Sequence, residues 1–238
     1  FEDSIHKAVR SLEIGVHRLY LKGIEQLDDA ALESRLIKPD DERLFLIAEA
    51  FRRGYDLQRI QDLTKIDWWF LNKLEGMVAF EAKLRQEDLT PELLREAKRK
   101  GFTDRAIAEI RRQAGYSHLV TEQDVRALRK EYGLVPVYKM VDTCAAEFEA
   151  STPYYYSTYE TENEVTESGK PKVVVLGSGP IRIGQGIEFD YSTVHAVWAI
   201  QEAGYEAVII NNNPETVSTD FNTSDRLYFE PLFFEDVM

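Results

Sequence analysis

The chain has 238 residues, of which 44% are hydrophobic, so it is long enough for one or two domains with a sizeable core. Basic and acidic residues balance over residues 1–140, and the whole net charge of −13 falls on residues 141–238, which argues against a nucleic-acid partner. No apolar run approaches the roughly 18 residues of a membrane span. No signal peptide opens the chain and the single cysteine, Cys144, excludes an internal disulfide, so we expect a cytoplasmic protein with no membrane partner.

Residues 1–133 read as a series of short helices. The first is expected over residues 1–14, another from about Asp28, and a one-faced apolar helix from a cap formed by Asp40 or Asp41. Three helix ends combine a left-handed glycine, an aromatic residue that packs back, and the start of the next helix, a device that stacks helices as hairpins. These are Arg53-Gly54-Tyr55-Asp56, Lys100-Gly101-Phe102-Thr103 and, less completely, Ala114-Gly115-Tyr116-Ser117; Thr90-Pro91 and Thr121 open two further helices.

The helix that begins at Asp67 is the most apolar of the series. A helix that is apolar nearly all round is buried by more than one neighbour or by a second subunit. Its expected core stripe is Phe70, Leu74, Met77 and Leu84, and its other sides carry Trp68, Trp69, Leu71 and Val78.

Helix–glycine–helix turns also occur in DNA-reading modules, but the charge balance of this region favours simple packing. His6, His17 and His118 have no partners at ligand spacing, so we interpret them as structural residues.

The helical pattern stops between Val135 and Gly169, and the composition changes. Residues 135–148 look extended, residues 152–159 hold four tyrosines, and residues 142–168 contain acidic groups but no basic one. We interpret this stretch as a connector that its tyrosines dock on a surface, with an exposed hinge near residues 160–170. Cys144 has no nearby histidine or basic group and is interpreted as structural.

A glycine-rich loop follows the apolar run of residues 173–176, which we expect to be a buried strand. The spacing Gly177-x-Gly179-x-x-x-x-Gly184 is not that of a dinucleotide site, and the next strand ends in Asn211-Asn212-Asn213 rather than in a ribose-binding carboxylate. No G-K-[ST] follows, so an NTPase phosphate loop is excluded as well.

The remaining elements predict the start of a parallel α/β sheet: a helix over about 192–203, strands at 207–210 and 227–229, and a helix beginning near Glu235. The loops after the first two strands leave the same sheet edge, so Gly186, Glu188 and Glu215 should face a common space. With Arg182 as the one nearby base, this space suits a phosphate poorly and could form a polar passage.

Several long motifs closely resemble the large subunit of carbamoyl phosphate synthase, and the resemblance covers the whole chain. They are Gly177-Ser-Gly-Pro180, Ile183-Gly-Gln-Gly-Ile-Glu-Phe-Asp-Tyr191, Asn213-Pro-Glu-Thr-Val-Ser-Thr-Asp220, Thr223-Ser-Asp-Arg-Leu-Tyr-Phe-Glu-Pro231, the connector motifs Val141-Asp-Thr-Cys-Ala-Ala-Glu-Phe148 and Tyr156-Ser-Thr-Tyr159, and Arg10-Ser-Leu-Glu-Ile-Gly15.

The resemblance implies a multi-domain chain, an all-α oligomerisation domain followed by a partial α/β, parallel-sheet (pre-ATP-grasp) domain. Residues 1–15 resemble the tail of the first synthetase unit, and 16–160 the helical oligomerisation domain with its connector. Residues 161–170 would be the hinge, and 171–238 the truncated start of the second unit. Because the chain opens on Phe1 and closes in a helix start, we expect a piece of a longer protein.

The resemblance also implies an activity for the parent enzyme, a ligase that makes carbamoyl phosphate from bicarbonate, ammonia released from glutamine, and two ATP. It implies ATP, Mg²⁺ or Mn²⁺, and K⁺ for that enzyme, with none bound here and no catalytic or metal residue in this stretch. The implied partners are the rest of the large subunit, a glutaminase small subunit and further copies through the helical domain. Arginine and pyrimidine synthesis both remain open as destinations.

By the same resemblance, Gly186, Glu188 and Glu215 match positions that line a carbamate passage between the two active sites. One alternative is that Glu188 and Glu215 merely satisfy backbone amides at helix starts. Another is that the chain is an autonomous helical scaffold or binding module with a small α/β unit.

Overall fold

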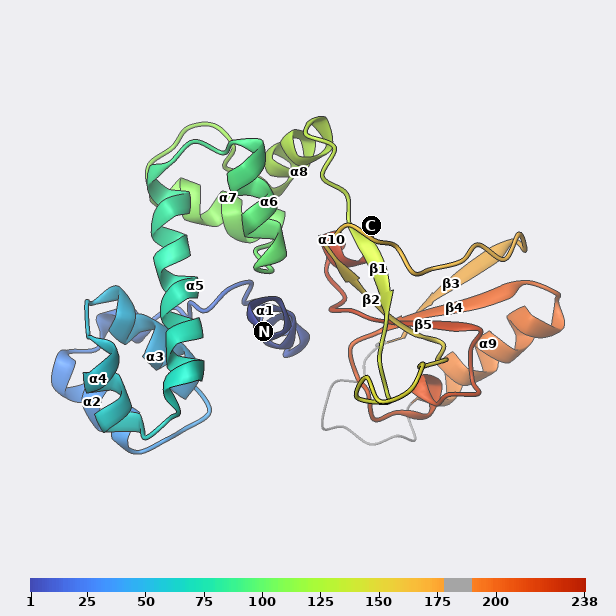
Figure 1. The fold of residues 1–238 in the computed structure, drawn as a ribbon, viewed down its shortest axis with the longest axis horizontal. Helices are drawn as coiled ribbons and strands as arrows, with labels where there is room; N and C mark the ends of the chain where they lie inside the picture. Colours follow the sequence, from blue (N-terminus) through green and yellow to red (C-terminus); the bar gives the residue numbers. More distant parts are fainter. Residues whose placement is uncertain (178–189) are drawn as a thin grey trace. The chain divides into compact units, whose positions relative to one another are not determined.

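The computed structural model describes residues 1–177 and 190–238. The chain forms two compact units, one of Phe1–Val9 and Ile14–Gly133, the other of Arg10–Glu13 and Leu134–Met238. The helical elements before Gly133 are α1 (Glu2–Ser11), η1 (Ile24–Gln26), α2 (Asp29–Ile37), α3 (Arg43–Arg52), α4 (Leu57–Thr64), α5 (Trp68–Gln86), α6 (Pro91–Arg99), α7 (Asp104–Gln113) and α8 (Glu122–Glu131) (Figure 1).

Helix ends in the first unit follow from local sequence. At Gly54, Gly101 and Gly115 the backbone is left-handed, with φ of 81°, 80° and 87°. The amide of the next residue donates to the carbonyl five positions back, for example from Tyr55 to Ala50 at 3.0 Å. These are Schellman ends, as predicted, and the aromatic residue is buried at Tyr55 and Phe102. The predicted caps Asp28, Asp67, Thr90 and Thr121 each accept a backbone N–H of their own helix.

One predicted cap is wrong. The residue that precedes α3 is Glu42, whose side chain makes no capping bond, rather than Asp40 or Asp41. The Asp40 carboxylate instead accepts from the backbone N–H of Glu42 at 3.0 Å and pairs with Arg35. A short aspartate turn therefore competes with direct capping and delays the helix.

Helix α5 is the spine of the first unit and packs against α3, α4 and α7. Its buried stripe is rotated from the predicted one, because Leu71 is fully buried whereas Phe70 is 45% exposed. The predicted Leu74, Met77 and Leu84 are buried, and Phe80 and Glu81 join them. Trp68 and Trp69 remain exposed with Phe70, so the described chain covers only one side of this helix.

The second unit is built on one five-stranded sheet of order β1-β2-β5-β4-β3. Strands β2 to β5 run parallel, and β1 is antiparallel to β2. The elements are β1 (Val137–Met140), β2 (Tyr154–Thr158), β3 (Lys172–Leu176), α9 (Tyr191–Glu202), β4 (Glu206–Asn211), η3 (Val217–Thr219), β5 (Arg226–Phe229) and α10 (Phe234–Val237).

The connector is part of this sheet. The Tyr154 ring packs on Phe229 with centroids 5.4 Å apart, and the Tyr155 ring lies 5.5 Å from that of Tyr228. The tyrosines therefore dock the segment, as expected, but through strand pairing as well as side chains. Only residues 137–140 of the expected extended stretch 135–148 form a strand.

The expectation of a buried strand at β3 is wrong for this structure. Val174 and Leu176 are 53% and 54% exposed, and only Val175 joins the core that α9 builds with Val197 and Ile209. The reason is position: β3 is the edge strand, and among the described residues α9 covers only one face of the sheet. Figure 1 shows α9 running alongside β3 and β4.

Candidate functional site at the carboxyl edge of the sheet

Three parallel strands end at one edge of the sheet. Leu176 pairs with Ile210, and Asn211 pairs with Phe229, so β3, β4 and β5 end at the same edge of the sheet. Ligands of open α/β sheets bind at such an edge. The register therefore agrees with the expectation that the first two apolar strands end at a common edge.

Gly177 is required where β3 ends. A Cβ added there would lie 2.8 Å from Nδ2 of Asn211 and 3.0 Å from its Cγ, closer than side chains pack. Asn211 is almost completely buried, and its Oδ1 accepts from the backbone N–H of Asn213 at 3.0 Å. The glycine thus makes room for an amide that organises the turn after β4.

A buried carboxylate holds the rest of this edge. Asp190 is 1% exposed and accepts from the backbone N–H of Ser218 at 2.6 Å and from the hydroxyl of Thr216. Asn211 Nδ2 in turn reaches Ser218 Oγ at 3.4 Å. These polar groups hydrogen-bond to one another, so they hold the loop that follows β4 in place and are not available to bind a ligand.

Glu215 stands apart from that network. It is exposed, and its backbone N–H donates to Oδ1 of Asn213 at 3.0 Å. Within residues 1–177 and 190–238 its carboxylate has no hydrogen bond or ion pair, and the start of η3 is formed by Thr216 rather than by Glu215. Gly186 and Glu188, with Arg182, lie outside the described residues, and their grouping with Glu215 stays a prediction.

Sequence reasoning did not single out Asp190, Thr216 and Ser218, although all three fall within motifs that carried the resemblance. A usable signal was the run of asparagine, threonine and serine directly after an apolar strand, because short polar side chains bond to nearby backbone. Their convergence on Asp190, 26 residues from Thr216 in the chain, is a tertiary fact.

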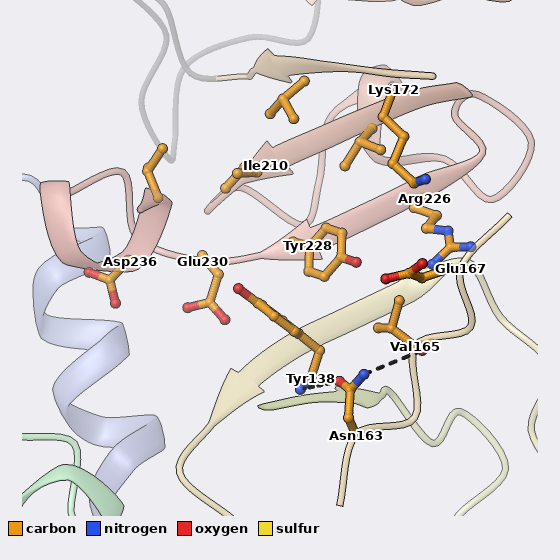
Figure 2. A pocket seen from close by; sticks show the side chains of 13 residues that line it. Tyr138, Asn163, Val165, Glu167, Lys172, Ile210, Arg226, Tyr228, Glu230 and Asp236 are labelled. Carbon is orange, nitrogen blue, oxygen red and sulfur yellow. Dashed lines mark hydrogen bonds between the residues drawn. The ribbon is translucent and has the colours of Figure 1, made fainter. Parts of the chain in front are cut away.

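The face of the sheet that α9 does not cover carries a hollow of about 540 Å³ (Figure 2). Val174, Val208 and Ile210 give it an apolar floor, and the rings of Tyr138 and Tyr228 flank it at a centroid distance of 5.2 Å. Burial raises the pKa of the Tyr138 phenol, and the negative charge of Glu230 raises it further.

The basic groups at the rim of this hollow share one carboxylate as their ion-pair partner. Arg226 lies 2.6 Å from Glu206, and Lys172 lies 3.6 Å from the same carboxylate. An apolar floor with internally paired charges is typical of a packing surface and offers little to a reacting substrate.

Two stretches of the chain match family models. Residues 1–133 match the carbamoyl-phosphate synthetase large chain, oligomerisation domain, and residues 169–238 match the carbamoyl phosphate synthase preATP-grasp domain. The first match alone covers more than half of the chain. The chain belongs to the carbamoyl-phosphate synthetase large chain family.

This membership confirms the fold class expected from the sequence, a helical oligomerisation region followed by a preATP-grasp α/β region. Among the described residues of this large-chain segment, no three His, Cys, Asp or Glu side chains gather as a metal site would require. Nor does any described helix combine the length and apolarity needed to cross a membrane.

Proposed function

We propose that this chain joins the two synthetase units of a glutamine-dependent carbamoyl phosphate synthase and holds its large chains together. The order of the two family matches carries the proposal, with an oligomerisation domain first and a preATP-grasp domain after it. In the complete enzyme, bicarbonate, ammonia from a glutaminase small subunit and two ATP would yield carbamoyl phosphate for arginine or pyrimidine synthesis. ATP, Mg²⁺ or Mn²⁺, and K⁺ would be held by other parts of the large chain. A cytoplasmic location suits the lone, unpaired Cys144.

Self-association is the testable core of this proposal. Sedimentation velocity of the 238-residue chain over a wide range of concentrations should show a dimer or larger species that grows with concentration. Circular dichroism of the same samples would establish that the helices are intact. A folded chain that stays monomeric at the highest concentration would contradict the assembly role.

For the second unit, we propose that Gly186, Glu188 and Glu215 line a carbamate passage. The exposed, unpaired carboxylate of Glu215 at the carboxyl edge of β4 supports this role among the described residues. A glycine at position 186 would keep the passage wide enough for the solute. The two carboxylates would favour neutral carbamic acid over an anion, because like charges repel.

The passage is tested in the complete enzyme with Gly186→Phe. The variant should lose carbamoyl phosphate synthesis while bicarbonate-dependent ATP hydrolysis and ATP formation from carbamoyl phosphate continue. Glu149→Phe, which puts the same bulk at an exposed connector position, is the matched control and should keep the coupled rate. A Gly186→Phe enzyme with an unchanged coupled rate would refute the passage without touching the assembly role.

A further inference from the structure

Helix α5 has a glycine in its middle that its own unit does not explain. Gly76 is exposed, and a Cβ added there would meet no atom of the described residues within 4 Å. Its φ lies outside the left-handed region, so alanine would fit without strain. Glycine in a helix interior costs about 1 kcal/mol relative to alanine. The missing side chain therefore points to a close neighbour that is not among the described residues of this chain.

The same exposed face continues with small residues. Ala79 and Ala82 lie one and two turns beyond Gly76, and both are exposed. Helices with small residues at the contact can approach to the short end of the usual interaxial range of about 8–10 Å. At the start of the helix Trp68 and Trp69 extend this face with exposed apolar surface.

A hollow of about 680 Å³ flanks this face. Ala79, Ala82 and Arg85 line it from α5, and Tyr55 lines it from the turn between α3 and α4. Tyr55 is 7% exposed, yet its buried hydroxyl has no hydrogen-bond partner in the described part of the chain. A buried polar atom without a partner costs about 1–3 kcal/mol, so an incoming polar group would find a ready contact here.

The face is complementary to itself. If two copies of α5 lie antiparallel with Ala79 at the symmetry axis, Gly76 of one faces Ala82 of the other. Glu75 then faces Lys83, and neither makes an ion pair within residues 1–177 and 190–238. The exposed amides of Asn72 and Gln86 complete the row, again one against the other.

We propose that the face Asn72–Glu75–Gly76–Ala79–Lys83–Gln86 of α5 is a two-fold contact between two copies of this chain. The inference rests on the proposed assembly role and names the surface and the partner that serve it. Small residues at the axis permit close approach, and the Glu75–Lys83 pairs set the antiparallel direction.

Cysteine cross-linking in a Cys144→Ser background tests the symmetry. Ala79→Cys should give a covalent dimer with oxidised glutathione as the acceptor of the two thiol hydrogens, since a disulfide needs Cα atoms within about 7 Å. Asn72→Cys alone should not cross-link, because position 72 faces 86, whereas Asn72→Cys combined with Gln86→Cys should. A helix separates positions 72 and 86 by about 21 Å, which excludes a bond within one chain. Failure of both Ala79→Cys and the double variant would overturn the proposal.

Charge placed at the axis gives an independent readout. Ala79→Glu brings two carboxylates together and should raise the dissociation constant by about tenfold or more in sedimentation. Ala30→Glu, at an exposed alanine of α2, is the matched control and should leave association unchanged. If the chain associates but Ala79→Glu has no effect, this surface is wrong and the assembly role stands. If the unaltered chain never associates, the assembly role itself fails.

Discussion

At the residue scale, two glycines with the same backbone conformation have different reasons to be glycine. Gly54 and Gly101 both follow a helix with φ near 80°. A Cβ at Gly54 would meet nothing among the described residues, whereas one at Gly101 would lie 2.7 Å from Cα of Asp3 in α1. Gly54 is therefore set by backbone conformation alone, and Gly101 also by the close approach of a distant helix.

This difference predicts unequal effects of alanine. Gly54→Ala should lower the free energy of unfolding by about 1–2 kcal/mol, the cost of a left-handed alanine. Gly101→Ala should lower the free energy of unfolding by about 1–3 kcal/mol more than Gly54→Ala does, because the added methyl overpacks against Asp3. Urea unfolding followed by circular dichroism measures both, and equal losses would show that α1 does not pack at Gly101.

Glu81 is a buried carboxylate of the helical unit that pairs with two arginines. It is 3% exposed and accepts from Arg18 at 3.1 Å and from Arg52 at 3.0 Å. Burial by itself raises the pKa of this carboxyl, but Arg52 and Arg18 outweigh burial and hold the pKa below its ordinary range. Ionised Glu81 is thus favoured in the folded state.

Protonation of Glu81 makes the stability of the helical unit depend on pH. In the unfolded chain the glutamate carboxyl has a pKa of about 4.3. The stabilisation by ionised Glu81 is therefore fully present above that pH, and it is lost as the pH falls through the lower pKa of the folded state. Glu81→Gln should flatten the loss of stability below that pH and, by leaving Arg18 and Arg52 uncompensated, reduce stability at neutral pH by about 3–5 kcal/mol. Glu42→Gln, which removes a partly exposed partner of Arg35, should change it by about 0–1 kcal/mol. Melting curves from pH 3 to 7 would reveal an error if both variants behaved alike.

At the element scale, the aspartates that precede α2 and α3 differ in whether a side chain reaches the first turn of the helix. Asp28 does so, accepting from the N–H of Ala31 at 2.7 Å. Asp41, the other candidate before α3, has no such bond in the described residues, and Asp40 is engaged in a turn of its own. Identical residue types before two helices therefore have different roles.

Alanine substitution should separate the two aspartates. Asp28→Ala should destabilise the helical unit by about 1 kcal/mol through loss of the cap. Asp41→Ala should stay within about 0.5 kcal/mol, as for most exposed positions. Thermal unfolding of the two variants in the same buffer measures both effects. A larger loss of stability for Asp41→Ala than for Asp28→Ala would indicate that Asp41 does cap α3.

At the scale of the whole molecule, the tyrosine-rich connector supplies two strands, β1 and β2, to the sheet of the second unit. Strand β2 lies between β1 and β5, and Leu227 N–H donates to the carbonyl of Pro153 at 2.8 Å. Without β1 and β2, the edge of β5 would be left open, and open strand edges invite association.

Hydrogen exchange of the intact chain tests this arrangement. Peptides from β2 should exchange about as slowly as those from β5, because both strands sit inside the sheet. Residues 142–151, which form no strand, serve as the control within the same molecule and should exchange fast. Rapid exchange throughout residues 137–158 would mean that the connector is not held in the sheet.

The sequence by itself determined the features that depend on neighbours along the chain. Glycine–aromatic helix ends, the caps at Asp28, Asp67, Thr90 and Thr121, and the alternation of strands with α9 follow from local backbone chemistry and periodicity. The long motifs also indicated the family, which the matches to residues 1–133 and 169–238 confirm.

Tertiary structure alone decided the features that depend on distant neighbours. Leu71 rather than Phe70 faces the core of α5, since the adjoining helices set which side is covered. An apolar run at β3 reads as buried, but its edge position leaves it open on the face away from α9. Asp190 meets Thr216 and Ser218 only when the sheet brings them together, because spatial proximity across the fold leaves no periodic signal in the sequence.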